Sequence, residues 1–568
     1  MNTYETKYTP FKPVDIKNRQ WPSRTITKVP IWCSVDLRDG NQALINPMNV
    51  SEKLELFKTL VKLGIKEIEV GFPSASQTEF DILRTLIDEG HIPDDVTIQV
   101  LVQAREHLIR KTFDAVKGAK NVIIHFYNST STLQRKVVFK KDMQGIINIA
   151  KDGATLIKEL ADQAKAESDM NIRFEYSPES FSGTEPDNSV LICEKVMEAL
   201  GASEDNKVIL NLPSTVECST PNGYADQIEY FCTHISNPQN AIISLHPHND
   251  RGTAIASAEL GMLAGAQRVE GTLFGNGERT GNVDIITLAL NMHTQGINPM
   301  LDLSNINSIR EVYERTTRMH VHERHPYAGD LVFTAFSGSH QDAISKGKLY
   351  MKESKSPQWE VPYLPIDPAD IGREYDPVIR INSQSGKSGA AYIIENQFGF
   401  FLPKPMQVEF GNAVKAYCDQ KGTEISNNDI YDIFKKEYLD ISGPYVLLSH
   451  KFHETSEVND TSPKVVFEGL LKHNGNEPIE ISGNGNGPID AFFSALSKVG
   501  ITGYKFIDYR EHSISIGSDA KAVSYIHLSD KDENNIFGIG ISHNITYASL
   551  RGVLCAINRS ILKQQNEK

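Results

Sequence analysis

The chain has 568 residues, of which 40% are hydrophobic and 23% charged, and its formal net charge is −14. This length predicts more than one domain, and an acidic balance without a Lys/Arg stripe argues against a nucleic-acid-binding protein. The six cysteines have no paired spacing, residues 1–24 lack the apolar core of a signal peptide, and no apolar run approaches the ~20 residues that span a bilayer. We therefore expect a cytoplasmic protein without a nucleic-acid or membrane partner.

Short apolar runs alternate with amphipathic segments between residues 31 and 295. In residues 51–63, for example, Leu54, Phe57 and Leu60 recur at helical spacing behind Ser51, the expected N-cap. A doubly wound open sheet would need a glycine-rich phosphate turn after its first strand, and the chain has none there. Eight strand-then-helix units instead predict an α/β fold, a (β/α)8 TIM barrel. The expected strands are 31–37, 67–72, 97–103, 121–127, 172–177, 207–212, 241–245 and 268–274.

The seventh of these strands leads directly into His246-Pro247-His248. Side chains two apart in an extended chain point to the same side, so the two imidazoles can face one cation. A pair of turn histidines without an ion is the alternative for this segment alone. A carboxylate is the natural third ligand, and Asp39 stands just past the first strand. Because catalytic residues of a barrel gather at the C-terminal strand ends, we expect these side chains to meet at one site.

Other polar residues follow the same strand ends. They are Arg38, His125, Ser177, Glu179 and Thr215. The eighth strand is followed by the glycine-rich loop 275–282, which either offers backbone N–H groups to an anion or turns the chain into the next helix. On its own pattern the plain turn is favoured.

The pattern changes after residue 300. Residues 303–345 are expected to be helical and contain His340, although a lone histidine is more often structural than catalytic. Residues 346–388 are rich in Pro, Lys and Ser, which predicts an irregular connecting segment. We expect an N-terminal extension over 1–30, a catalytic barrel over 31–302, linker subdomains over 303–440 and a separate α+β domain over 441–568, to which the resemblance described below assigns leucine binding and regulation.

The last 130 residues contain two strand-turn-helix units, which suggests an internal duplication. This region offers no catalytic constellation, so a binding or association module is expected. A small ligand could lie at a helix N-terminus beside the glycine-rich turn 483–488.

Five segments carry a family resemblance, namely 35–44, 69–73, 175–180, 246–250 and 275–282. On these segments the chain resembles the acetyl-CoA-dependent condensing enzymes of the aldolase-like barrel family, and within it the 2-isopropylmalate synthases. The resemblance runs from about residue 25 to the C-terminus. The sequence at 337–340 and 361–365 is similar to that of the longer, bacterial and actinobacterial type of the enzyme. It implies condensation of acetyl-CoA with 2-oxoisovalerate and thioester hydrolysis, the first committed step of leucine biosynthesis, with feedback inhibition by leucine.

The resemblance also implies roles for individual residues around a divalent metal, Mg²⁺, Mn²⁺ or Zn²⁺. Arg38 would hydrogen-bond the developing alkoxide or enolate oxygen. Glu179 would remove a proton from the acetyl methyl group, or else act only as a positioning group. The metal would be held by Asp39, His246 and His248, with Asn282 as an additional oxygen ligand.

Further roles follow for substrate binding and for the assembly. His125 and Ser177 would line the 2-oxo acid pocket, and Thr215 would bind a substrate carboxylate. His340 and Tyr363 would reach the active site from the partner subunit of a homodimer. Leucine would act as an allosteric inhibitor on the terminal module, beside Gly485, Asn486, Gly487 and Pro488.

Several other functions fit the same barrel and metal. Citramalate synthase, homocitrate synthase and an acyl-CoA lyase are the nearest, although 2-oxoglutarate would need a second cation and a lyase would not need the terminal module. A non-catalytic leucine sensor with an inactive barrel is the alternative from another class. It is disfavoured because Arg38, Asp39, Glu179 and both histidines are present.

Overall fold

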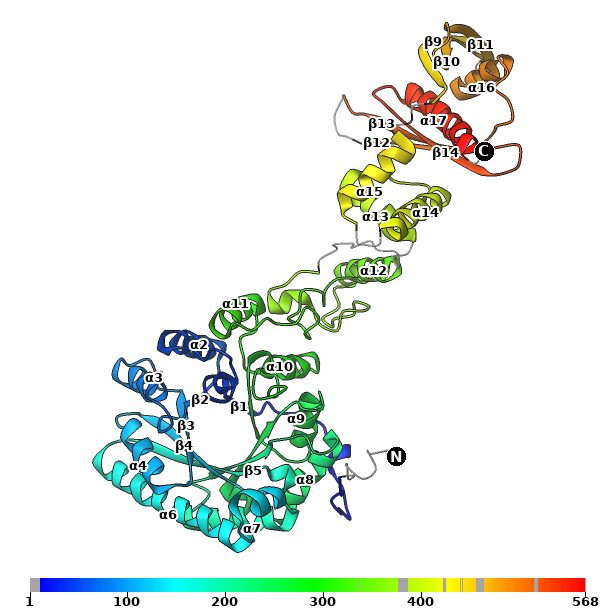
Figure 1. The fold of residues 1–568 in the computed structure, drawn as a ribbon. Helices are drawn as coiled ribbons and strands as arrows, with labels where there is room; N and C mark the ends of the chain where they lie inside the picture. Colours follow the sequence, from blue (N-terminus) through cyan, green and yellow to red (C-terminus); the bar gives the residue numbers. More distant parts are fainter. Residues whose placement is uncertain are drawn as a thin grey trace. The chain divides into compact units, whose positions relative to one another are not determined.

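A computed structural model describes residues 11–335, 337–375, 387–421, 425–439, 441, 443–455, 464–514 and 519–566 (Figure 1). The first ten residues of the expected N-terminal extension lie outside the described residues. The chain divides into two compact units, Met1–Phe333 with Pro365–Tyr375, and Thr334–Leu364 with Asp376–Lys568. Within the described residues, no helix combines the length and apolar character needed to cross a membrane.

The first unit is built on a closed barrel of eight parallel strands, each paired with its neighbour in sequence order and the first paired with the last. This confirms the predicted TIM barrel. The strands are β1 (Ile31–Ser34), β2 (Glu67–Gly71), β3 (Thr97–Gln103), β4 (Asn121–Ser129), β5 (Asn171–Glu179), β6 (Val208–Ser214), β7 (Ala241–Pro247) and β8 (Arg268–Gly271).

Helices cover the outside of this barrel (Figure 1). They are α2 (Val50–Leu63), α3 (Gln77–Asp88), α4 (Glu106–Ala115), α6 (Met143–Glu167), α7 (Pro186–Leu200), α8 (Pro221–His234), α9 (Ala254–Leu263) and α10 (Ile285–Thr294), followed by α11 (Ile306–Thr317). The expected N-cap Ser51 is wrong. Asn49 caps α2 instead, because its side chain accepts the N–H of Glu52 while the Glu52 carboxylate accepts the N–H of Asn49.

The first and last strands are shorter than predicted. β1 ends at Ser34, and residues Asp36–Gly40 form a single π-helical turn, η2, while β8 ends at Gly271. The Asp36 carboxylate accepts the Ser34 hydroxyl at 2.7 Å and the backbone N–H of Leu273 at 3.0 Å. This buried carboxylate ties the two strand ends together and turns the chain out of the sheet. Residues 38 and 39 therefore stand on a helical turn at the mouth of the barrel.

The second unit begins with helices α12 (Gly338–Ser354), α13 (Lys387–Phe398), α14 (Lys404–Lys421) and α15 (Asn427–Phe434). The prediction of irregular structure for residues 346–388 is therefore wrong over residues 346–354, where α12 continues. Residues 303–345, which were expected to be helical, are only partly so, since α11 ends at Thr317 and α12 starts at Gly338.

Two similar sheet-and-helix repeats follow within this second unit. Three antiparallel strands and a helix occur twice, which supports the predicted internal duplication. The first repeat has β9 (Tyr445–Thr455), β10 (Lys464–His473), β11 (Ile479–Gly485) and α16 (Pro488–Lys498), and the second repeat has β12 (Lys505–Ser513), β13 (Ala522–Ser529), β14 (Asn535–Ser542) and α17 (Ile545–Asn566).

The first half of the glycine-rich segment 483–488, which was expected to be a turn, is strand. Gly483 and Gly485 belong to β11, and only two residues separate β11 from α16. A Cβ atom on either glycine would lie 2.3 Å from backbone atoms of Ala491 in α16. Gly538 and Gly540 of β14 allow the same close approach of α17. These glycines therefore let each helix pack directly on its sheet.

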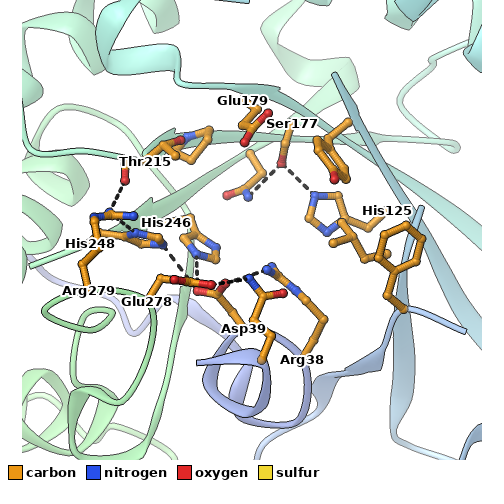
Figure 2. Close-up of a pocket in the computed structure, with 16 residues that line it drawn as sticks. Arg38, Asp39, His125, Ser177, Glu179, Thr215, His246, His248, Glu278 and Arg279 are labelled. Atoms are coloured by element: carbon orange, nitrogen blue, oxygen red, sulfur yellow. Dashed lines mark hydrogen bonds and ion pairs between the residues drawn. The ribbon is translucent and has the colours of Figure 1, made fainter. Parts of the chain in front are cut away.

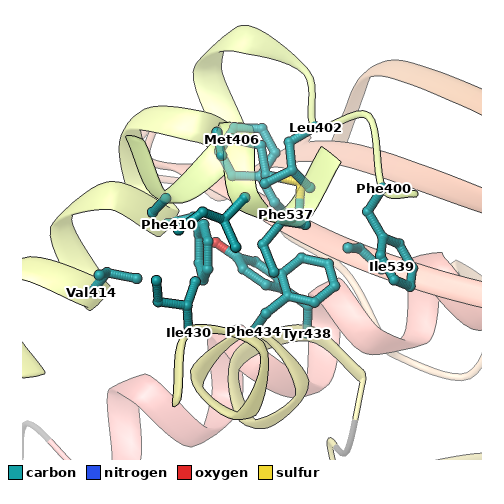
Figure 3. Packing of buried hydrophobic residues seen from close by; sticks show 14 of the residues in the cluster. Phe400, Leu402, Met406, Phe410, Val414, Ile430, Phe434, Tyr438, Phe537 and Ile539 are labelled. Carbon is teal, nitrogen blue, oxygen red and sulfur yellow. The ribbon is translucent and has the colours of Figure 1, made fainter. Parts of the chain in front are cut away.

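One apolar core of the second unit joins the helical segment to the second sheet. Phe410, Phe434 and Tyr438 pack there against Phe537 and Ile539 of β14 (Figure 3). Residues on both sides of position 441 thus share one core, and removal of the terminal sheets would expose it.

Candidate active site

A cavity of about 380 Å³ lies at the C-terminal ends of the barrel strands (Figure 2). Eight residues that the sequence singled out line it, namely Arg38, Asp39, His125, Ser177, Glu179, Thr215, His246 and His248. Eight further lining residues were not predicted from the sequence, namely Gln42, Phe72, Leu101, Tyr127, Asn211, Pro213, Glu278 and Arg279.

Asp39, His246 and His248 offer ligand atoms that all lie within 4.8 Å of one another. The Nε2 atoms of the two histidines are 3.6 and 3.4 Å from Asp39 Oδ2, so the last turn of chain at the end of β7, with the residue that follows it, presents both rings to one point. Asn282 donates its Nδ2 to Asp39 Oδ2 at 2.7 Å. Its buried Oδ1 has no hydrogen-bond partner among the described residues. An unpaired buried acceptor beside a carboxylate and two imidazoles fits a divalent cation.

The electrostatics of this cluster also suit a cation. Burial disfavours the charged form of Asp39, but Arg38 and the two histidines hold the pKa of its carboxyl well below its usual range. Burial likewise opposes protonation of His246, yet its contacts with Asp39 and Glu270 raise the pKa of this imidazole to about 9. A cation bound at Nε2 of His246 would take the place of a proton.

His246 and His248 differ in what faces their second nitrogen. Nδ1 of His246 lies 2.7 Å from Glu270 Oε2, the arrangement in which a metal-bound histidine donates to a carboxylate. Nδ1 of His248 instead lies 2.7 Å from Nη2 of Arg279, which can only donate. A ligand nitrogen must be deprotonated, so a neutral His248 that binds through Nε2 carries its proton on Nδ1. Cation binding through Nε2 therefore requires Nη2 of Arg279 to move away from Nδ1 of His248.

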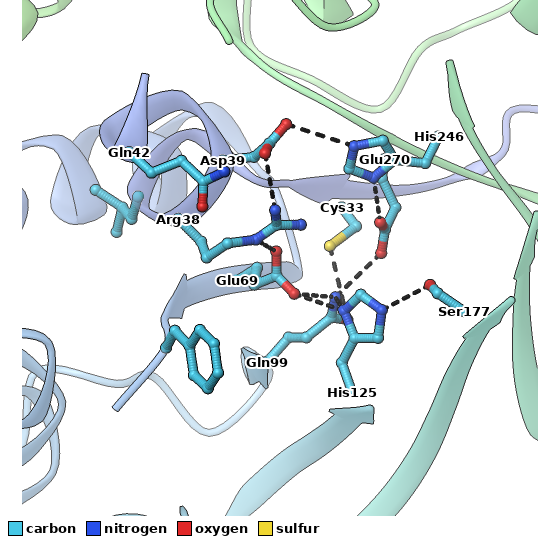
Figure 4. A network of polar contacts seen from close by, with 12 residues as sticks. Cys33, Arg38, Asp39, Gln42, Glu69, Gln99, His125, Ser177, His246 and Glu270 are labelled. Atoms are coloured by element: carbon cyan, nitrogen blue, oxygen red, sulfur yellow. Dashed lines mark hydrogen bonds and ion pairs between the residues drawn. The ribbon is translucent and has the colours of Figure 1, made fainter. Parts of the chain in front are cut away.

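A buried polar network lies beneath the cavity (Figure 4). His125 is held by Glu69 Oε1, 2.6 Å from Nδ1, and by Ser177 Oγ, 2.7 Å from Nε2. Glu69 also accepts hydrogen bonds from Gln99 and from Nε of Arg38. One carboxylate thus fixes both the imidazole and the guanidinium that line the cavity.

Arg268 forms the centre of a second part of this network. Its fully buried guanidinium lies 2.6 Å from Glu67, 2.7 Å from Glu270 and 3.2 Å from Glu175. Burial and the neighbouring carboxylates raise the pKa of Glu175 well above its usual range, which favours the neutral acid. The available signal in the sequence was charge at alternating positions of β2 and β8, as in Glu67-Ile68-Glu69 and Arg268-Val269-Glu270.

Glu179 and Thr215 face the cavity from the ends of β5 and β6. The Glu179 carboxylate accepts a hydrogen bond from the Ser129 hydroxyl. The Thr215 hydroxyl oxygen accepts the backbone N–H of Ser180 at 2.9 Å, so its own proton remains available to a ligand.

The loop 275–282 contributes side chains to the site. Glu278 and Arg279 line the cavity, and Asn282 reaches Asp39. A Cβ atom on Gly281, at φ +97°, would lie 1.8 Å from the carbonyl oxygen of Gly275, so the loop can close only with glycine there. The loop therefore turns the chain into α10, as the favoured interpretation expected, and it also brings side chains to the cavity.

His340 and Tyr363 belong to the second unit, at the start of α12 and in a later turn. Their rings stack with centroids 4.0 Å apart. Both side chains are exposed, Tyr363 to 62%. The structure therefore brings these two predicted residues together as a surface pair of their own unit.

Three family models match the chain. They are "HMGL-like" over residues 29–312, "Alpha-isopropylmalate synthase, post-catalytic domain-like" over 330–395 and "LeuA allosteric (dimerisation) domain" over 424–561. The third match indicates a dimeric assembly with allosteric regulation.

The chain is similar to a solved structure over about half of its length and to named relatives over nearly all of it. A solved HMG-CoA lyase from Brucella melitensis is similar with a TM-score of 0.40 and 18% identity, covering 52% of this chain and 100% of that one. A 2-isopropylmalate synthase from Acetoanaerobium sticklandii is 52% identical over 561 residues, 99% of this chain and 98% of that one. The 2-isopropylmalate synthase from Clostridium acetobutylicum is 56% identical over 557 residues, 98% of this chain and 99% of that one. With this identity over almost the full length, and a barrel mouth that assembles a metal-ligand set, the chain belongs to the 2-isopropylmalate synthase family.

Proposed function

We propose that the protein condenses acetyl-CoA with 2-oxoisovalerate and hydrolyses the thioester, which yields 2-isopropylmalate and free CoA. The observation that carries this proposal is the pairing, in one cavity, of the metal-ligand set with the apolar side chains Phe72, Leu101 and Pro213. A 2-oxo acid has a chelating ketone and carboxylate at one end, and 2-oxoisovalerate has an isopropyl group at the other. Family membership supports the same reaction.

The 2-oxo acid is oriented by the ligand set and its neighbours. Asp39, His246 and His248, with Oδ1 of Asn282, would hold Mg²⁺, Mn²⁺ or Zn²⁺, and the bound ion would supply Lewis acidity to the ketone. The Thr215 hydroxyl donates a hydrogen bond to the substrate carboxylate. Phe72, Leu101 and Pro213 give the cavity an apolar part, while the polar groups of His125 and Ser177 already bond to each other, which suits an uncharged isopropyl group.

The acetyl group needs a base and a partner for the developing charge. Glu179 removes a proton from the acetyl methyl group, and the Ser129 hydroxyl holds its carboxylate in place. Arg38 donates a hydrogen bond to the resulting enolate oxygen. The methyl carbon then bonds to the ketone carbon, and water cleaves the thioester C–S bond, which makes the condensation irreversible.

His340 and Tyr363 complete the active site of the partner subunit in a homodimer. The support is that an imidazole and a phenol, both able to transfer protons, stack on the surface of their own unit. The match of this chain to a dimerisation domain provides the partner.

Leucine binds a cavity of about 410 Å³ in the terminal region and inhibits from there. Gly487, Pro488, Asp490, Phe493 and Phe506 line this cavity. The backbone at the start of α16 suits a carboxylate, Asp490 suits an ammonium group, and the two phenyl rings suit an isobutyl side chain. Gly485 and Asn486, also predicted to contact leucine, do not line this cavity. Gly485 packs on α16, and the N–H of Asn486 donates to the Asp490 carboxylate at 2.9 Å.

Release of free CoA thiol from acetyl-CoA tests this function. We expect the highest kcat/KM with 2-oxoisovalerate, and lower values with pyruvate and 2-oxoglutarate. Because one methylene in an apolar pocket is worth only ~1–3 kcal/mol, weak activity with neighbouring 2-oxo acids is also expected. A clear preference for pyruvate would instead assign the chain to citramalate synthesis.

A further inference from the structure

The condensation leaves one series of hydrogen-bonded side chains at the cavity wall without a chemical role. Ser177, His125 and Glu69 form this series, in that order (Figure 4). Ser177 Oγ lies 2.7 Å from Nε2 of the imidazole, and Glu69 Oε1 lies 2.6 Å from Nδ1 on the other side of the ring. A hydroxyl, an imidazole and a carboxylate linked in this order can activate a serine for attack on a carbonyl carbon.

Glu69 fixes the tautomer of His125. Burial opposes ionisation of Glu69, but Arg38 and the contact with His125 lower the pKa of its carboxyl below the usual value. An ionised carboxylate can only accept, so Nδ1 of His125 carries a proton and Nε2 of the neutral ring is an acceptor. The side chains of Glu69 and His125 are 0% and 3% exposed, which shields their contact from water.

Asn211 fixes the direction of the Ser177 hydroxyl. Its amide nitrogen Nδ2 donates to the Glu270 carboxylate at 3.0 Å and also to Ser177 Oγ at 3.0 Å. Because Ser177 Oγ accepts from Asn211, its own proton is directed to Nε2 of His125. The hydroxyl is thus oriented for transfer of its proton to the imidazole.

Ser177 and His125 face the catalytic cavity, and the same cavity offers a place for an ester. Leu101 and Pro213 give it an apolar part, which suits a short uncharged acyl group. Arg38 also lines the cavity, and its Nη2 has no hydrogen-bond acceptor in the described part of the chain. This N–H group is available to the negatively charged oxygen that forms when a carbonyl carbon is attacked.

We propose that Ser177, His125 and Glu69 form a catalytic triad that hydrolyses small uncharged carboxylic esters, a second activity of the barrel that needs neither the divalent metal nor a 2-oxo acid. Ser177 Oγ attacks the ester carbonyl carbon while Nε2 of His125 takes the hydroxyl proton. The carbon–oxygen bond to the alcohol then breaks, and His125 gives the proton to the departing oxygen.

Water completes the cycle. Its oxygen attacks the acyl carbon on Ser177 while His125 takes one of its protons. The bond between the acyl carbon and Ser177 Oγ breaks, His125 returns the proton to Oγ, and the free acid leaves. One ester and one water thus give one acid and one alcohol, and the condensation is not required for this reaction.

Hydrolysis of p-nitrophenyl acetate by the full-length protein tests the triad. Rates are measured with the divalent metal bound and again after its removal with EDTA. Ser177→Ala removes the nucleophile, and His125→Gln removes the base. Ser236→Ala is the matched control, because Ser236 is exposed and does not line the cavity. Far-UV circular dichroism checks that each variant is folded.

A second measurement identifies the nucleophile without a substitution. Phenylmethanesulfonyl fluoride reacts with an activated serine, so that a bond forms between sulfur and Oγ, fluoride leaves and the hydroxyl proton passes to the base. Peptide mass spectrometry then identifies the labelled residue. We expect the label on Ser177 in the unmodified protein and in Ser236→Ala, and no label on Ser177 in His125→Gln.

We expect kcat/KM for p-nitrophenyl acetate to fall by at least about 10²-fold in Ser177→Ala and in His125→Gln. It should stay within about twofold of the unmodified protein in Ser236→Ala and after EDTA treatment. Hydrolysis no faster than in buffer, equal rates in Ser177→Ala and the unmodified protein, loss of hydrolysis with EDTA, or a label that is absent from Ser177 would each overturn the triad. Release of CoA from acetyl-CoA is a separate assay, so the proposed function can fail or stand independently.

Discussion

The barrel floor and the terminal sheets bury opposite kinds of side chain. Beneath the catalytic cavity, Arg268 is fully buried among carboxylates. In the first terminal sheet, Phe467 packs edge-on against Phe492 of α16. Burial of ions carries a large desolvation cost that only complete pairing offsets, whereas aromatic burial stabilises directly. The barrel interior therefore gives up stabilising apolar packing to hold charged groups beside the cavity, whereas the terminal region gains stability from its apolar core.

The same comparison applies to how residues are assembled. In the barrel, each of several strands contributes one or two polar side chains to a single point (Figure 2). In the terminal region, one sheet-and-helix design is repeated, and glycines on β11 and β14 bring each helix onto its sheet. Loss of one side chain should thus abolish chemistry in the barrel but only weaken binding in the terminal region.

The largest effect is expected from the ligand set. Asp39→Ala or His246→Ala should lower turnover by about 10³-fold or more and release the divalent metal, because each substitution removes one of the side chains that bind the ion directly. Elemental analysis and CoA release measure the two effects, and far-UV circular dichroism checks that the fold persists. His107→Ala, an exposed histidine outside the cavity, is the control. Full metal content in both variants would show that these residues are not ligands.

A buried carboxylate outside the ligand set gives the next largest effect. Burial raises the pKa of Asp36 to about 7, despite its contacts with Ser34 and Leu273. Between about pH 4 and pH 7 the unfolded chain loses this proton while the native chain keeps it, so the native state loses stability as pH rises. Asp36→Asn removes this loss and can keep both hydrogen bonds.

The free energy of unfolding of Asp36→Asn, relative to the unmodified protein, should therefore rise by about 3 kcal/mol between about pH 5 and pH 8. Urea unfolding at the two pH values measures it. Asp114→Asn, at an exposed position of α4, should show no such rise. A difference that does not depend on pH would contradict a carboxyl that is protonated in the native state.

A smaller effect, recovery of part of the activity, is expected when two inactive variants are mixed. His340→Ala and His246→Ala chains should each be inactive as homodimers. In a heterodimer, one active site combines an intact barrel with an intact His340 from its partner, so CoA release should return. Verified heterodimers without any activity would place His340 in the site of its own chain or outside catalysis.

Much of the barrel could be predicted because its signals are local. Eight apolar runs with intervening helices defined the strands, and the two-residue spacing of His246 and His248 placed both rings on one side. The end of β1 could not be predicted, because Asp36 turns the chain through a hydrogen bond to Leu273, 237 residues away. The N-cap of α2 was misplaced because Ser51 and Asn49 are both good caps.

The buried charges escaped prediction for a different reason. In a barrel strand such as Glu67-Ile68-Glu69-Val70, the apolar residues face the helices and the charged residues face the interior. The same alternation in an isolated sheet would indicate a solvent-exposed polar face. Gly483 and Gly485 were read as a turn because the need for them arises from the helix that packs on the strand. Such requirements become visible only in the tertiary structure.

The separation of chemistry from regulation is tested most directly by leucine inhibition of CoA release at increasing 2-oxoisovalerate. The comparison uses the unmodified enzyme, Phe493→Ala in the terminal cavity, and Phe452→Ala, a half-buried phenylalanine of the same region outside that cavity. We expect inhibition to persist at saturating 2-oxoisovalerate, and leucine to be about tenfold less potent on Phe493→Ala but not on Phe452→Ala. Relief of inhibition by saturating 2-oxoisovalerate, or equal leucine potency on all three proteins, would contradict a separate regulatory site in the terminal cavity.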